Sequence, residues 1–107
     1  MPPKIDMSME KITVTVDADL EDLIPGFLEN RARDVRELSS ALGRGDFESI
    51  RLTGHSMKGS GGGYGFDALT DLGAAIEAAA KAADATAIAK LIEELNEYLQ
   101  RVEVTYG

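Results

Sequence analysis

The chain has 107 residues, contains no cysteine and carries a formal net charge of −8 at pH 7. This length suits one domain that buries a core without disulfides or a structural metal, and the absence of cysteine excludes a disulfide framework, a thiolate nucleophile and a cysteine-based zinc site. The acidic balance and the lack of a long apolar run argue against binding to nucleic acid or to a membrane, so we expect a cytoplasmic protein.

The first segment, residues 1–16, contains no apolar stretch of signal-peptide length. Within it, the stretch KITVTV at residues 11–16 alternates apolar and polar side chains, which is the period of a half-buried strand. No second strand is predicted for it to pair with. We therefore expect an extended N-terminal arm over residues 1–16, followed by a helical domain over residues 17–107.

Four long helices are predicted after the arm, preceded by a short one. Pro25 suits a first helical turn, so the pattern predicts a short helix over about residues 18–24 and a long one over about 25–43. Asp46, Asp67 and Asp84 have the short acidic side chain that caps helix starts, which predicts three further helices. Apolar residues recur at steps of three and four in each helix. Because the connections are short, we expect an all-α fold, an up-down antiparallel four-helix bundle.

The stretch GHSMKGSGGGYG at residues 54–65 contains the only histidine of the chain. On a helical wheel His55 lies about 130° from the centre of the apolar stripe of its helix, so the imidazole faces solvent. Lys58 and Gly59, three and four residues later, border the same surface patch. The lysine supplies positive charge there, and the glycine leaves space beside a nucleophile.

The glycines near this histidine are expected to serve different faces of the helix. Each glycine inside a helix costs about 1 kcal/mol relative to alanine, so the run of glycines up to residue 63 needs compensation. Gly54 and Gly61 fall on the packing side, where they let a neighbouring helix approach closely. Gly63 and Gly65 are placed to end the helix and turn the chain, whereas Gly62 has no predicted role.

Other sites that glycine-rich or histidine-containing stretches form do not fit this sequence. A phosphate-binding P-loop requires lysine where Ser60 stands, and the dinucleotide fingerprint requires glycine or alanine where Tyr64 stands. A single histidine without cysteine makes a poor metal site. Ser56 diverges from His55 by about 100° on a helix, which argues against a serine–histidine hydrolase pair. The imidazole itself is therefore the better nucleophile.

The segment GHSMKGSGGGYGFDALTDLGAAIE resembles the histidine phosphotransfer (HPt) domains of bacterial multistep phosphorelays. Their hallmark is a solvent-facing histidine in the motif His-x-x-Lys-Gly-Ser on a four-helix bundle, and His55, Lys58, Gly59 and Ser60 fill this motif. The resemblance covers roughly residues 20–102. It implies a phosphoryl carrier without kinase activity, in which His55 takes the group from a receiver-domain aspartate and passes it to another receiver domain in two-component signal transduction. The receivers would bring the magnesium.

Further site residues follow from the resemblance and from the helical wheel. Some family members hold the second ring nitrogen of the histidine through a side chain of the following helix, and Glu77 lies at the matching distance, with a plain surface glutamate as the alternative. Leu52 lies about 170° from the core direction and is a candidate for docking receiver domains, with Arg51 at the rim. Ile24 and Phe27 are further docking candidates, with core packing as the alternative.

Two other functions stay open from the sequence. The bundle could bind receiver domains as a scaffold without phosphorylation, although a scaffold has no use for Lys58 and Gly59. Alternatively, KITVTV could pair with the sheet edge of a partner, which would make the chain a helical interaction module. We expect a monomer that takes no cofactor. The starting methionine and the compact length favour a free-standing protein over a piece of a hybrid kinase.

Overall fold

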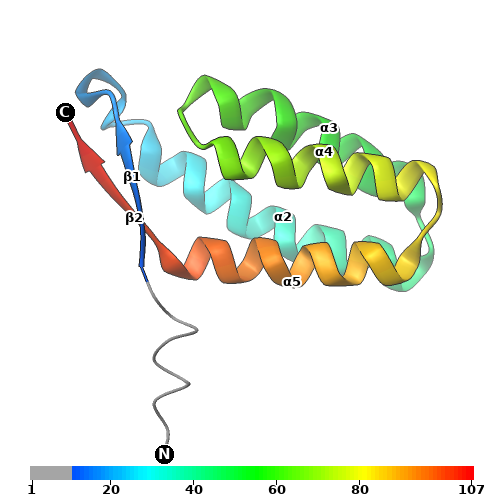
Figure 1. Cartoon of the computed structure of the whole chain (residues 1–107). Coiled ribbons are helices and arrows are strands. Elements are labelled where there is room, and N and C mark those ends of the chain that lie inside the picture. The colour runs from blue at the N-terminus through cyan, green and yellow to red at the C-terminus, as the bar shows by residue number, and fades with distance from the viewer. Residues whose placement is uncertain (1–10) are drawn as a thin grey trace, which may run out of the picture.

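The computed structural model describes residues 11–107, in which four helices form a bundle and two strands form a small sheet at one end (Figure 1). In chain order the elements are strand β1 (Ile12–Val16), a 3-10 turn η1 (Ala18–Leu20), helices α2 (Ile24–Arg44), α3 (Phe47–Gly63), α4 (Asp67–Lys81) and α5 (Ala85–Arg101), and strand β2 (Val102–Tyr106). Each helix contacts the next one along the chain, and α5 returns against α2. The predicted four-helix bundle is confirmed, whereas the first ten residues of the predicted arm lie outside the described residues.

The short helix predicted over residues 18–24 is absent from the described residues. In its place Ala18–Leu20 form a single 3-10 turn, and the side chain of Asp17 accepts a hydrogen bond from the amide of Asp19 at 2.9 Å. No residue of this 3-10 turn is buried, so packing does not stabilise a longer helix there, and short helices are marginal by themselves. Pro25 is tolerated only in the first turn of a helix, because its ring would clash with the carbonyl four residues earlier. The continuous helix therefore begins at Ile24, with the proline in that turn.

Two of the three predicted aspartate caps are present. Asp46 and Asp84 each accept a hydrogen bond at 3.1 Å from the backbone amide three residues later. The prediction that Asp67 caps its helix is wrong, because Asp67 is the first residue of α4 and the cap position belongs to Phe66, whose ring is fully buried. The Asp67 carboxylate still lies in the first turn, where the positive end of the helix dipole stabilises its negative charge.

Strand β1 has a partner, which corrects the prediction that it stands alone. It pairs in parallel with β2, with Ile12 opposite Val102 and Val16 opposite Tyr106. Sequence patterns missed β2 because Val102 fits the apolar stripe of the preceding helix and also begins the alternation of Val102 and Val104 that suits a strand. Val16 is buried in the core, so the residues of β1 belong to the folded unit.

Helices α3 and α4 pack against each other through glycines. A Cβ atom added to Gly54 or Gly61 would lie 2.8 or 2.9 Å from the backbone of α4, and one added to Gly73 would lie 2.6 Å from the backbone of α3. The predicted packing role of Gly54 and Gly61 is confirmed, and Gly73 is the third member of this contact. Because the two backbones approach so closely, Glu77 of α4 comes within reach of the surface of α3.

A Gly73→Ala variant should unfold more easily than the wild type. The added methyl group would collide with the amide nitrogen of Lys58 at 2.6 Å, and neither backbone can move without repacking the core. We expect a loss of about 1–3 kcal/mol in the free energy of unfolding, measured by chemical denaturation. Gly43→Ala is the matched control, because a Cβ atom there meets nothing within 4 Å and should leave stability equal or slightly higher. Equal stability of both variants would contradict this account of the α3–α4 contact.

Candidate functional site

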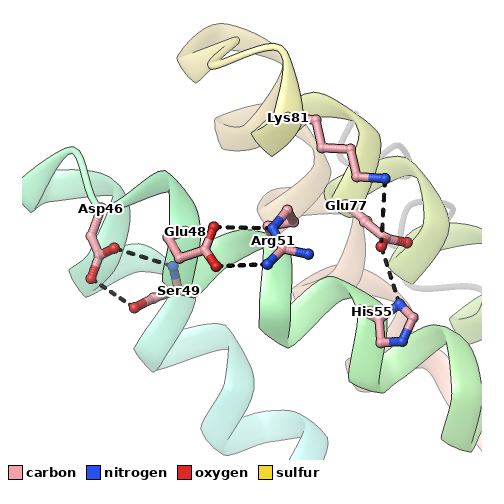
Figure 2. Close-up of polar contacts among 7 residues, drawn as sticks. All are labelled: Asp46, Glu48, Ser49, Arg51, His55, Glu77 and Lys81. Atoms are coloured by element: carbon pink, nitrogen blue, oxygen red, sulfur yellow. Dashed lines mark hydrogen bonds and ion pairs between the residues drawn. The ribbon is translucent and has the colours of Figure 1, made fainter.

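His55 projects into solvent from the middle of α3. Its side chain is 64% exposed, whereas Gly54 and Met57 of the same helix are buried against the rest of the bundle. The helical periodicity that buries these two positions turns the imidazole outward, as the wheel predicts. Figure 2 shows the ring beside α4, with one edge directed toward Glu77.

Glu77 comes from the neighbouring helix and is the one buried charged residue among the described residues. Its Oε2 lies 3.1 Å from Nδ1 of His55, and its Oε1 lies 3.0 Å from Nζ of Lys58. One carboxylate therefore joins the imidazole and the ammonium group that the sequence places on the same surface patch. A freely solvated surface glutamate, the alternative left open by the sequence, does not describe this position.

The protonation state of Glu77 determines the tautomer of His55. The hydrogen bond from Lys58 is the main cause that holds the pKa of Glu77 below its ordinary value of 4.5, and the hydrogen bond from His55 adds to it. At neutral pH the carboxylate is therefore ionised and can only accept hydrogen bonds. Nδ1 must then carry the proton, so in the neutral imidazole the lone pair is on Nε2, the nitrogen on the other side of the ring.

Lys81 is a second cation near this carboxylate. Its Nζ lies 3.9 Å from Oε2 of Glu77, one helical turn further along α4 (Figure 2). Lys81 was not among the predicted site residues, although its position four residues after Glu77 puts both on one helix face. With Lys58, it surrounds the carboxylate with positive charge.

Gly59 leaves open space beside the imidazole, one helical turn from His55. A Cβ atom built on Gly59 would meet nothing within 4 Å. Gly59 thus differs from Gly54 and Gly61, whose missing side chains are needed for helix packing. Gly65 has a φ of +86°, which suits the predicted turn after the helix.

Ser60 points away from the histidine cluster toward α2. Its hydroxyl oxygen accepts a hydrogen bond from Nη1 of Arg31 at 2.8 Å. The motif residues His55, Lys58 and Gly59 thus surround one surface, whereas Ser60 links α3 to another helix. Nothing in the sequence pattern indicated Arg31 as its partner.

Leu52 is a large apolar side chain that remains 53% exposed. It lies one turn before His55 and lines a groove of about 390 Å³ between α2 and α3, whose floor includes Leu38 and Ala41. Arg51 lies next to it and forms an ion pair of 2.6 Å with Glu48 (Figure 2). The wheel prediction that Leu52 faces solvent is thus confirmed, whereas its docking role stays a prediction.

The other two docking candidates are wrong. Ile24 is 1% exposed and Phe27 is 7% exposed, so both belong to the core. The Phe27 ring packs 4.6 Å from the ring of Tyr64 and 5.3 Å from that of Phe66, measured between ring centroids. The turn after α3 covers this end of α2, and a helical wheel of α2 alone does not include that contact.

Glu77 should make the stability of the protein depend on pH. Because its pKa in the folded state lies below the ordinary value of 4.5, the ionised carboxylate adds stability that is fully present above pH 4.5 and is lost as the pH falls through the folded-state pKa. The wild type should therefore melt at a higher temperature than Glu77→Gln at pH 7, and this difference in melting temperature should become smaller below pH 4.5. Glu93→Gln, at an exposed position of α5, is the control for a surface glutamate. A difference in melting temperature that stays constant down to pH 3 would contradict a stabilising role of the ionised Glu77 carboxylate.

Within residues 11–107 neither a cluster of metal-binding side chains nor a membrane-spanning helix occurs. No group of three or more potential metal-binding side chains occurs there. None of the described helices has the length and hydropathy needed to cross a membrane.

Comparison with known proteins identifies the family. The family model described as the Hpt domain matches residues 22–105, which include all four helices. No curated protein and no solved structure matches the chain significantly. The matched segment carries His55, Lys58 and Gly59 in the arrangement just described. The chain therefore belongs to the Hpt domain family, the phosphotransfer carriers of phosphorelay signalling.

Proposed function

We propose that this chain is a histidine-containing phosphotransfer protein that accepts a phosphoryl group on His55 from the aspartate of one receiver domain and passes it to another. It has no kinase activity of its own. The observation that carries this proposal is the exposed imidazole of His55, whose Nδ1 lies 3.1 Å from the buried carboxylate of Glu77. That hydrogen bond leaves Nε2 as the free nucleophile.

In the acceptance step, the lone pair of Nε2 attacks the phosphorus of the phosphoaspartate. An N–P bond forms, the P–O bond to the aspartate breaks, and the aspartate carboxylate leaves with the electron pair. The ring becomes positively charged while Nδ1 keeps its proton, and the Glu77 carboxylate stabilises that charge through the existing hydrogen bond. When a second aspartate attacks the same phosphorus, the electron pair returns to Nε2.

Lys58 and Gly59 support the transferred group in different ways. The Lys58 side chain is 42% exposed and its ammonium group holds one oxygen of Glu77, so its other N–H donors are available to phosphoryl oxygens. Gly59 leaves space where a side chain would overlap the phosphoryl group. The role of Ser60 in this proposal is structural, since its hydroxyl is directed to Arg31.

Receiver domains would dock on the surface formed by α2 and α3 around Leu52 and Arg51. Between Arg31 and Lys58 the sequence contains six basic and four acidic residues, although the whole chain carries a net charge of −8. The segment that carries this surface is therefore net basic, unlike the chain as a whole, and it suits a partner whose phosphorylated site is negatively charged. The exposed Leu52 and its groove add the apolar contact that a transient complex requires.

Phosphotransfer from receiver domains tests the function directly. The wild-type chain is incubated with each receiver domain of the source organism after that domain has been labelled with radioactive phosphate. We expect at least one receiver to transfer a label that is lost in acid and kept in base, as phosphohistidine requires. Absence of transfer from every receiver, together with binding of a receiver to the unlabelled chain, would support a scaffold function instead.

A further inference from the structure

The last turn of α3 is intrinsically weak. Four of the five residues from Gly59 to Gly63 are glycine, and each lowers helix stability relative to alanine. A Cβ atom on Gly59 or Gly63 would meet nothing within 4 Å, so the side-chain positions of both residues face open space. Ser60 supplies the only side chain of this turn.

Arg31 holds that single side chain from the neighbouring helix. Its Nη1 donates to Ser60 Oγ at 2.8 Å, and its Nε forms an ion pair with Asp34 at 2.8 Å. The guanidinium carbon also lies 5.1 Å from the centroid of the Phe27 ring. The Arg31 side chain is only 12% exposed, so it is fixed on several sides and shielded from water.

The turn that carries Lys58 depends on the turn that follows it. In an α-helix each carbonyl accepts from the amide four residues later, so the carbonyls of residues 55–59 accept from the amides of residues 59–63. Unwinding of the glycine-rich turn would therefore release the backbone that carries Lys58. The ammonium group of Lys58 would then lose its contact of 3.0 Å with Glu77.

We propose that Arg31 is a positioning residue for phosphotransfer, because its hydrogen bond to Ser60 keeps the end of α3 helical and thereby holds Lys58 next to Glu77 and His55. This inference rests on the proposed function of the chain as a phosphoryl carrier. Arg31 does not touch the reacting atoms; it acts through the helix end that carries them.

The test compares an Arg31→Met variant with the wild type. Methionine keeps an unbranched apolar chain but cannot donate to Ser60. We expect the rate of phosphoryl acceptance to fall roughly tenfold and amide hydrogen exchange at residues 59–63 to rise by a similar factor, the size expected for one charge-assisted hydrogen bond. An unchanged rate would overturn the inference.

Restoring the helix end by another route separates positioning from general loss of stability. Gly62→Ala together with Gly63→Ala, added to Arg31→Met, strengthens the same turn with at most one ordinary contact, 3.5 Å to Thr70 Oγ1. These alanines should return the rate to near the wild-type value. Gly43→Ala raises helix stability in α2 instead and should rescue nothing. If Gly43→Ala rescued the rate equally well, Arg31 would have only a general structural role.

The inference and the proposed function can fail separately. If the wild type accepts no phosphoryl group from any receiver, the proposed function is wrong, and with it the part of the inference that concerns transfer. Hydrogen exchange at residues 59–63 would still show whether Arg31 holds the end of α3. If the wild type is labelled but Arg31→Met exchanges as slowly as the wild type, the inference alone is overturned.

Discussion

A His55→Gln variant should take up no acid-labile phosphate from any receiver domain, while its fold stays intact. Glutamine is of similar size and its amide can still donate to Glu77, but an amide nitrogen has no available lone pair for attack on phosphorus. Because the His55 side chain is 64% exposed, the change should alter the free energy of unfolding by no more than about 0.5 kcal/mol. Loss of labelling at unchanged stability would therefore reflect lost chemistry.

Ser56→Ala is the matched control for this experiment. Ser56 is the exposed neighbour of His55 and the nearest hydroxyl along the chain that could be labelled by mistake. We expect Ser56→Ala to be labelled like the wild type. A label on His55→Gln that is lost in acid would show that another group accepts the phosphoryl, whereas an acid-stable label would indicate phosphorylation of a hydroxyl.

The bundle could be predicted from sequence because its signals are local. The apolar steps of three and four, the aspartates at residues 46 and 84 and the proline at residue 25 each act within one or two helical turns. The parallel pairing of β1 with β2 joins residues at opposite ends of the chain, so no local pattern could indicate it. Val102 even satisfied the helical pattern that precedes β2.

The candidate site likewise has a part that local sequence patterns predict and a part that depends on contacts between helices. His55, Lys58 and Gly59 lie within five residues on one helix, so a helical wheel places them on one surface. The family resemblance suggested the contact of Glu77 with His55, with a plain surface glutamate as the alternative. The simultaneous contact of Glu77 with Lys58 and its burial depend on the close approach of α3 and α4 at Gly73. Helix packing of this kind is not encoded in the period of either helix.

Burial overturns the docking predictions for Ile24 and Phe27, whereas Leu52 is exposed as its wheel position predicts and its docking role stays a prediction. Leu52 lies in the second turn of α3, where apolar residues before and after it define the direction of the core. Ile24 and Phe27 lie in the first turn of α2, where both are buried, and aromatic residues of a distant turn pack on Phe27. A helical wheel therefore predicts side-chain exposure least well at helix ends, where residues from other parts of the chain bury the side chains.

The strongest test of the site's shape concerns Gly59, which differs from the other helical glycines near it. Gly54 and Gly61 are required by packing, so their substitution would change the fold and the site together. Gly59 has open space around its Cβ position, so a larger residue fits the isolated protein without collision. We therefore expect any cost of a side chain at this position to arise when a phosphoryl group and its donor domain occupy that space.

A Gly59→Gln variant should remain folded, with a helix content and a melting temperature no lower than those of the wild type, because glutamine is a better helix former than glycine. Its rate of phosphoryl acceptance should nevertheless fall about tenfold to a hundredfold, which corresponds to the ~1–3 kcal/mol of an overpacked contact in the transition state. Gly63→Gln, the same change at another open position eight residues from His55, should transfer at the wild-type rate. Initial rates of label uptake from one phosphorylated receiver would measure both variants. Equal rates for Gly59→Gln and the wild type would show that the space beside the imidazole is not needed for transfer.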